Sequence, residues 1–234
     1  MATSLRNSLV IFRDALRFAT LTFSSSNRKT GRMAQLQILA RGSDPVQAVN
    51  SGADEAVCGD CPLRKQQATG KRVCYVNLAW APLAIYRAVV GHPVTGLAKV
   101  LKRLGNRPVR FGSYGDPAFL PLDLLSALAQ GRRHTGYTHQ WRTVSRRYAA
   151  HLMASVESLA DRAKAKALGY RTFRVVSDVS EIANGEILCP NYTHGTQCAD
   201  CGLCMGAGTA KDIVILAHGN GAGYLQPVEA VASA

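Results

Sequence analysis

The residues of this chain with the clearest chemistry are its cysteines, which fall into two groups. The first group is Cys58, Cys61 and Cys74, and the second is Cys189, Cys198, Cys201 and Cys204. In the second group, the Cys-x-x-Cys-x-x-Cys spacing lets a short loop place three thiolates around one inorganic centre, with the fourth thiolate supplied from upstream. The chain is therefore predicted to be a metalloprotein.

The spacing leaves the identity of the metal open. Closely spaced thiolates suit a [4Fe–4S] cluster, whereas a structural zinc site with four cysteines more often uses two separated Cys-x-x-Cys pairs. The second group therefore favours iron–sulfur, with zinc as the alternative. The first group supplies three thiolates, so two arrangements are open there. Either a histidine such as His92 completes a zinc site, or a [4Fe–4S] cluster keeps one iron open for a small molecule.

The elements that position these residues alternate along the chain. Hydrophobic runs predict strands at 33–40, 108–112, 134–139, 152–156, 170–176 and 211–218, and helical spacing predicts helices at 76–90, 120–129, 141–150 and 158–168. This alternation predicts an α/β fold, either a partial (β/α) barrel or an open parallel sheet, that carries two Cys-rich metal-binding loops.

The domain organisation follows from the same pattern. We expect residues 24–219 to form the α/β metal-binding domain and residues 220–234, which are rich in Gly and Ala, to form a flexible tail. Residues 1–23 are predicted to be a helical extension with Leu5, Leu9, Phe12 and Leu16 on its apolar side.

Polar residues mark the carboxyl ends of the predicted strands, where α/β folds place their chemistry. These residues are Ser113, Tyr114, Asp116, His139, Glu157, Ser177, Asp178 and His218. If the protein is an enzyme, Asp116, Tyr114 and His139 are the candidate catalytic residues that line its pocket.

Several short motifs occur in an order that resembles an uncharacterised family of phage and plasmid proteins, the phage gene product 88 type. The motifs are Ser26-Asn27-Arg28-Lys29-Thr30-Gly31, Cys58-Gly-Asp-Cys61-Pro, Cys74-Tyr75, Arg110 to Asp116 and the late cysteine loop. The similarity runs from about Ser24 to Gly219. It implies a phage-type protein that works in the cytoplasm of a bacterial host, and it implies no particular reaction.

The same layout is more distantly similar to radical S-adenosylmethionine enzymes, which combine a partial barrel with a three-cysteine cluster near the N-terminus. This similarity implies that the first cysteine group holds the open cluster. It also implies that Gly112, Ser113 and Gly115, in the turn that ends at Asp116, bind S-adenosylmethionine. The chain departs from the usual Cys-x-x-x-Cys-x-x-Cys motif, because twelve residues separate Cys61 from Cys74.

The net charge of +13 suggests a different function. Between Cys61 and Val156 there are fifteen Lys and Arg but only two acids, so this stretch accounts for the whole excess. A localised basic surface attracts nucleic acid. The candidate DNA- or RNA-binding residues are Arg132, Arg133, Arg142, Arg146 and Arg147, which flank aromatic residues of a kind that can stack on bases. In this alternative the metal sites are purely structural.

The sequence also bears on location. No apolar run approaches the ~20 residues that a membrane-spanning helix needs, and no secretory signal is evident, so we expect a cytoplasmic protein without a membrane partner. The Arg- and Ser-containing start resembles a mitochondrial transit segment as well, which we rank below the amphipathic helix.

Overall fold

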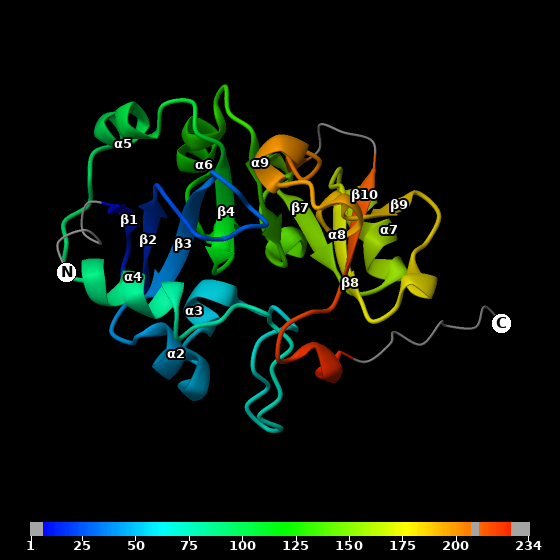
Figure 1. Cartoon of the computed structure of the whole chain (residues 1–234). Helices are drawn as coiled ribbons and strands as arrows, with labels where there is room; N and C mark the ends of the chain where they lie inside the picture. Colours follow the sequence, from blue (N-terminus) through cyan, green and yellow to red (C-terminus); the bar gives the residue numbers. More distant parts are fainter. Residues whose placement is uncertain (1–6, 207–210, 226–234) are drawn as a thin grey trace.

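The computed structural model describes residues 7–206 and 211–225, and its centre consists of two five-stranded sheets (Figure 1). The first sheet has the order β1 (Ser8–Arg13), β2 (Arg17–Thr22), β3 (Ala34–Ala40), β4 (Val109–Tyr114) and β5 (His134–Thr135). The second has the order β6 (Tyr137–Thr138), β7 (Met153–Val156), β8 (Thr172–Val176), β10 (Asp212–Leu216) and β9 (Glu186–Leu188). The pairings of β1 with β2 and of β2 with β3 are antiparallel, and all the others are parallel. The predicted α/β class is therefore confirmed.

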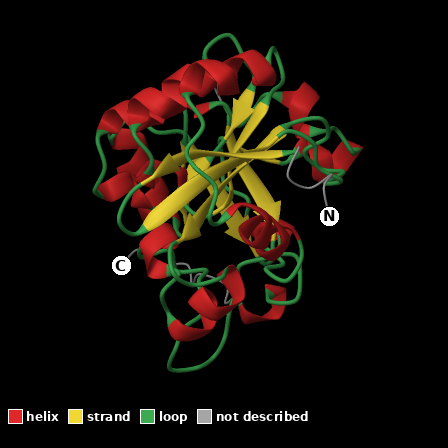
Figure 2. Ribbon diagram, turned by 90° about the vertical axis from the view of Figure 1, so that its left-hand side faces the viewer, coloured by secondary structure: helices red, strands yellow, loops and turns green. Residues whose placement is uncertain are grey.

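The two sheets continue into each other at a glycine. Only Gly136 separates β5, which pairs with β4, from β6, which pairs with β7. A Cβ atom on Gly136 would lie 2.6 Å from Leu152 Cδ2 and 2.9 Å from Phe111 Cβ, and both of those side chains are fully buried. Because no side chain fits there, the chain passes tightly from one sheet to the other, and the strands form one open array (Figure 2).

The helices lie around this array (Figure 2). They are α2 (Pro45–Ser51), α3 (Glu55–Cys58), α4 (Ala81–Val89), α5 (Leu97–Leu104), α6 (Leu122–Ala129), α7 (Leu159–Ala167), α8 (Pro190–His194) and α9 (Cys198–Cys201), with short 3-10 helices η1 (Pro117–Phe119), η2 (Gln140–Arg142), η3 (Arg146–Ala150), η4 (Val179–Glu181) and η6 (Ala222–Tyr224). The largest hydrophobic core joins the first sheet to α2, α4, α5 and α6. In the part of the chain described, no helix has the length and apolar character needed to cross a membrane.

The predicted helical extension at the N-terminus is wrong for the residues described. β1 and β2 form an antiparallel hairpin that extends the first sheet beyond β3, with Leu9 opposite Leu21. Five of the six residues of β2 are buried, on both faces of the sheet. The strand therefore lacks the polar–apolar alternation that distinguishes a half-buried strand from a helix. Residues 1–6 of the predicted extension lie outside the described residues.

Other boundaries differ as well. Residues 141–150 form the short helices η2 and η3 in place of the predicted basic helix. The reason is a tertiary contact: the buried indole N–H of Trp141 donates to the backbone oxygen of Ser155 at 3.0 Å. Helices α2 and α5 and strand β9 were not predicted. Of the predicted C-terminal tail, residues 220–225 contain η6, where Gly221 lies against the backbone of Arg72, and residues 226–234 lie outside the described part of the chain.

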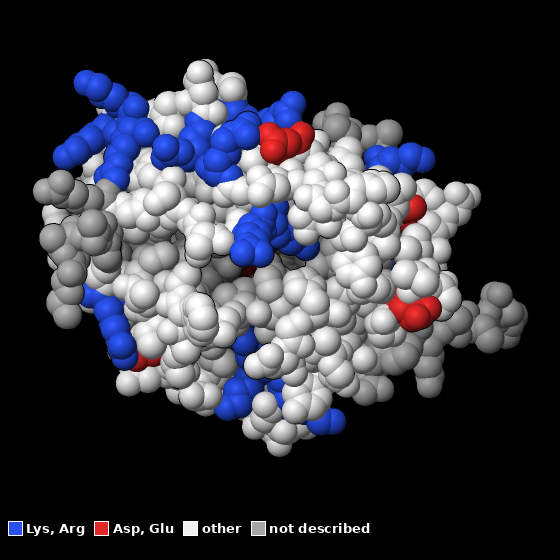
Figure 3. Space-filling view, viewed as in Figure 1, with Lys and Arg blue, Asp and Glu red and all other residues white. Residues whose placement is uncertain are grey.

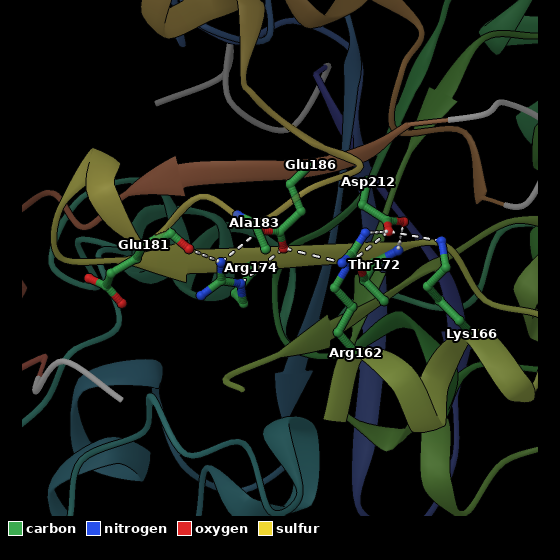
Figure 4. A network of polar contacts seen from close by, with 8 residues as sticks. All are labelled: Arg162, Lys166, Thr172, Arg174, Glu181, Ala183, Glu186 and Asp212. Carbon is green, nitrogen blue, oxygen red and sulfur yellow. Dashed lines mark hydrogen bonds and ion pairs between the residues drawn. The ribbon is translucent and has the colours of Figure 1, made fainter. Parts of the chain in front are cut away.

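Buried ion pairs attach the edge strand β9 and helix α7 to the second sheet (Figure 4). Arg174 donates to both carboxylate oxygens of Glu186 at 3.0 and 2.6 Å. Asp212 accepts from Arg162 at 2.8 Å and from Lys166 at 3.1 Å. Burial alone would raise the pKa of Asp212, but hydrogen bonds from the Thr172 backbone and these two side chains lower it. The contribution of Asp212 to stability is therefore retained at neutral pH and lost as the pH falls through this lowered pKa.

The substitution Asp212→Asn tests this network. It leaves Arg162 without a full counter-charge in a buried place, so we expect the free energy of unfolding to fall by about 3–5 kcal/mol. Asp200→Asn is the matched control, because its ion pair with Arg32 is more than half exposed (64% and 54%) and should contribute about 0–1 kcal/mol. Urea denaturation at pH 7 measures both changes. Equal losses of unfolding free energy in the two variants would contradict the conclusion that the buried ion pairs of Asp212 stabilise the fold.

Candidate metal centres

The first cysteine group lies where the chain leaves β3. Cys58 ends α3, and Cys61 and Cys74 belong to the loop that follows. The three thiols line one cavity of about 150 Å³. Burial, followed by the charges of Cys61, Asp54 and Cys74, raises the pKa of Cys58, so the three sulfurs influence one another electrostatically.

A partly buried arginine fixes the shape of this cysteine loop. Arg64 donates to both oxygens of Asp54, at 3.1 and 2.7 Å. The same guanidinium donates to the backbone oxygens of Gly59 at 2.5 Å and Gly52 at 2.9 Å. Because the Arg64 side chain contacts residues on both sides of α3, it fixes the backbone that carries Cys58 and Cys61.

His139 is the imidazole that approaches the first group. Its Nε2 lies 3.9 Å from Cys61 Sγ and 2.9 Å from Glu157 Oε1. Burial would lower the pKa of His139, but the charges of Cys61 and Glu157 raise it well above its ordinary value. His92, the histidine considered from the sequence, is exposed and lines neither of the two larger cavities. The sequence pointed to His139 through its place at the carboxyl end of a predicted strand, and gave no sign that it lies beside Cys61.

The Gly112–Asp116 turn divides its residues between two sides of the sheet. Gly112, Tyr114, Gly115 and Asp116 line the same cavity as the first cysteine group. Ser113 faces the other way, lines a second cavity and donates to Gln35 Oε1 at 2.6 Å. The turn therefore contributes residues to both cavities.

Both carboxylate oxygens of Asp116, a predicted catalytic residue, accept hydrogen bonds from backbone N–H groups. One carboxylate oxygen accepts from the N–H of Ala118 at 3.0 Å, and the other accepts from the N–H of His139 at 2.8 Å. Burial raises the pKa of Asp116, and these two hydrogen bonds lower it in part. Asp116 thus positions His139. The Tyr114 hydroxyl, in contrast, is buried and has no hydrogen-bond partner among the described residues.

The second cysteine group lies at the opposite end of the array. All four of its thiols line the second cavity, which has a volume of about 670 Å³. Helix α9 is anchored beside the start of β3, because the N–H of Cys198 donates to Lys29 O at 2.9 Å. Arg171, at the start of β8, donates to the Leu203 backbone oxygen at 2.7 Å. In Figure 1, α9 accordingly lies at the end of the strands that is remote from α3.

Two cysteines of the second group, Cys189 and Cys204, are buried, and Cys198 and Cys201 are partly exposed. Burial raises the pKa of Cys204 to about 12, although the adjacent Tyr137 phenol lowers it in part. Burial also raises the pKa of Cys198. Gly202, with φ of 70°, ends α9 and turns the chain toward Cys204.

The donor types in both groups fit iron or zinc, although the side chains are not closed around a centre. Within residues 7–206 and 211–225, no three His, Cys, Asp or Glu side chains are close enough to hold a metal ion as they stand. The second group supplies four thiols, and the first supplies three thiols with an imidazole nearby. Thiolate and imidazole are the ligands of iron–sulfur clusters and of zinc.

The predicted nucleic-acid residues are only partly available. Arg132 donates to the backbone oxygens of Gly105 and Gln130, and Arg133 to that of Asp200. Arg142 pairs with Asp161 at 2.8 Å. The side chains of Arg146 and Arg147 are exposed and have no hydrogen bond or ion pair with other described residues. Three of the five arginines therefore have partners within the protein, and Arg146 and Arg147 are free to contact another molecule.

The basic stretch between Cys61 and Val156 also exposes cations other than the five arginines named above. Helix α5 exposes Lys99, Lys102 and Arg103. Figure 3 shows Lys and Arg side chains gathered over this helix and along the adjoining upper edge of the molecule, whereas acidic side chains on this face are few.

No family model, curated protein or solved structure matches this chain. The resemblances given above therefore remain predictions.

The turn beside the first group offers a test of local geometry. Gly115 has φ of 78°, and a Cβ atom there would lie 2.7 Å from the backbone oxygen of Ile38. We expect Gly115→Ala to lower the free energy of unfolding by about 1–2 kcal/mol for the left-handed backbone, plus about 1–3 kcal/mol for overpacking.

Gly131→Ala is the matched control. Gly131 has φ of 67° but nothing within 4 Å of the added Cβ, so only the backbone cost applies. Urea denaturation of both variants separates the two contributions. Losses of the same size would show that the contact with Ile38 does not constrain the turn.

Proposed function

We propose that this protein is an iron–sulfur protein with two centres, of which the first is an open cluster that serves a radical S-adenosylmethionine-like reaction. The observation that carries the proposal is that both cysteine groups face a common interior. Seven residues line both cavities: Tyr75, Val76, Arg110, Tyr137, Phe173, Ile215 and His218. In structural metal sites the protein ligands fill every coordination position. The thiols of this protein instead face cavities that a small molecule can occupy.

The contacts of His139 favour an open first centre. Its Nε2 faces Cys61 at 3.9 Å but is already hydrogen-bonded to Glu157 at 2.9 Å. Ligation of a metal by this nitrogen requires that hydrogen bond to break. With Glu157 holding the imidazole, Cys58, Cys61 and Cys74 supply three thiolates and leave one position for a ligand.

The surrounding residues have roles that follow from their contacts. Arg64 holds the cysteine loop, Asp116 positions the backbone of His139, and the unpartnered Tyr114 hydroxyl is a polar group available to a ligand in the cavity. A bound [4Fe–4S] cluster would supply single electrons, which the reductive cleavage of S-adenosylmethionine requires.

Iron and sulfide content after anaerobic purification tests the proposal. We expect about eight irons and eight sulfides per chain for two [4Fe–4S] clusters. The variant Cys58→Ala/Cys61→Ala/Cys74→Ala should lose about half of each, and so should Cys198→Ala/Cys201→Ala/Cys204→Ala. A colourless protein with stoichiometric zinc would contradict the proposal.

Two further measurements distinguish an open cluster from a closed one. His139→Ala should keep the iron of the first centre if the imidazole is not a ligand, and should lose it if the imidazole is one. With a reductant and S-adenosylmethionine, the intact protein should release methionine and 5′-deoxyadenosine, and the first-group triple variant should release neither. Full iron content without this cleavage would leave electron transfer as the function.

The alternative function is nucleic-acid binding with structural metal sites. The exposed cations Arg146 and Arg147 and those of α5 favour it. In that case, binding to DNA or RNA should weaken with salt, and Arg146→Gln/Arg147→Gln should reduce the slope of log K against log salt by about 0.9 for each phosphate that the variant no longer neutralises. Lys211→Gln, at an exposed cation elsewhere, should leave the slope unchanged. No binding at low salt would exclude this alternative.

A further inference from the structure

In the part of the chain that the structure describes, the buried arginine Arg110 has neither a carboxylate partner nor a set of backbone acceptors, one or the other of which satisfies the arginines compared with it below. The buried Arg174 pairs with Glu186, and the partly buried Arg64 and Arg162 pair with Asp54 and Asp212. Arg171, which is 6% exposed, has no ion pair with a described residue but donates to the backbone oxygens of Leu203, Gly206 and Lys211. Arg110 is only 8% exposed, and no carboxylate among residues 7–206 and 211–225 forms an ion pair with it. A buried charge is costly unless it is paired and hydrogen-bonded, and Arg110 has one hydrogen bond among the described residues, so an anion beside it would stabilise its charge.

The donors of Arg110 are mostly unused and face the cavities. Its Nη1 donates to Thr135 Oγ1 at 3.3 Å, and its guanidinium carbon lies 4.5 Å from the centre of the Tyr137 ring. A guanidinium group has five N–H donors and binds carboxylate or phosphate oxygens in pairs. Arg110 lines both cavities, at the boundary between the two cysteine groups.

A second buried polar group also lacks a partner in the larger cavity. Gln37 is 4% exposed, lines this cavity, and its side-chain oxygen has no hydrogen-bond partner among the described residues. An unpaired buried amide oxygen costs about 1–3 kcal/mol. A hydroxyl or amine on a bound molecule would satisfy it.

One part of the wall of the larger cavity is apolar and aromatic. Phe173 stacks on Tyr137 with ring centroids 3.9 Å apart, and Ile213 and Ile215 continue this surface along β10. Trp80 lines the same cavity and is 75% exposed, which places it at the rim. A volume of about 670 Å³ lies within the ~300–1,000 Å³ range of small-molecule sites.

We propose that the larger cavity binds a small amphipathic oxyanion, with its carboxylate or phosphate on Arg110 and its apolar body against Phe173 and Ile215. The inference deepens the proposed function, because it names the substrate class of the same interior. The binding itself does not require that any reaction occur.

Binding of four probes with one aromatic body tests the proposal. The probes are phenylacetate, phenyl phosphate, 2-phenylethanol and 2-phenylethylamine, titrated calorimetrically into the anaerobically purified full chain. We expect at least one anion to bind about tenfold or more tightly than the alcohol, and the amine to bind more weakly than the alcohol. The stronger anion identifies carboxylate or phosphate as the preferred group. Equal affinity for the alcohol and both anions would overturn the proposal without any variant.

Two arginine variants locate the anion. Arg110→Gln should reduce the affinity for the preferred anion to that for the alcohol, and Arg110→Lys should restore part of the difference. Arg103→Gln removes an exposed cation of α5 and should change neither affinity. Loss of anion binding in Arg103→Gln, or unchanged anion binding in Arg110→Gln, would overturn the proposal.

Metal analysis of the same samples separates this inference from the proposed function. Full iron and sulfide content without a preference for anions refutes the anion site alone. A preference for anions in a protein without iron refutes the iron–sulfur proposal alone. If Arg110→Gln changes the visible spectrum but not anion binding, the counter-ion of Arg110 is the second metal centre, and the ligand site is refuted.

Discussion

The close approach of Gly136 to Phe111 and Leu152 is the constraint on which the rest of the structure depends. Because this residue has no side chain, one short stretch of chain pairs first with β4 and then with β7. His139 follows directly, and it therefore meets Asp116 after β4 and Glu157 after β7. The first cavity is built at this junction of the two sheets.

The same junction gives both cysteine groups one interior. Residues that alternate along the strands, such as Gln35 and Gln37 of β3, face the cavity, while Leu36 and Ile38 face the hydrophobic core. β3 is therefore buried on both faces for different reasons. One face stabilises the fold through apolar packing, and the other carries polar groups that the protein alone does not fully satisfy.

The sequence predicted β7, β8 and β10 of the second sheet well, because parallel strands buried on both faces read as continuous hydrophobic runs. The same property concealed the N-terminal hairpin, since a doubly buried β2 cannot be distinguished from a helix by periodicity. The prediction of a helix at 141–150 was wrong for another reason. Its basic residues suggest a solvent-exposed helix, but burial of Trp141 decides the local structure, and such a long-range contact leaves no local signal.

The sequence was enough to locate the two cysteine groups. The roles of the residues around them follow only from the three-dimensional structure. Asp116 was predicted as a pocket residue, and its cavity position agrees, yet its two oxygens are used on backbone N–H groups. Arg110 was counted only as part of a basic stretch. Whether a buried arginine has a carboxylate beside it depends on tertiary contacts, as between Arg174 and Glu186, and the sequence does not show those contacts. The placement of acids, more than that of the arginines, is therefore what makes Arg110 available to a ligand.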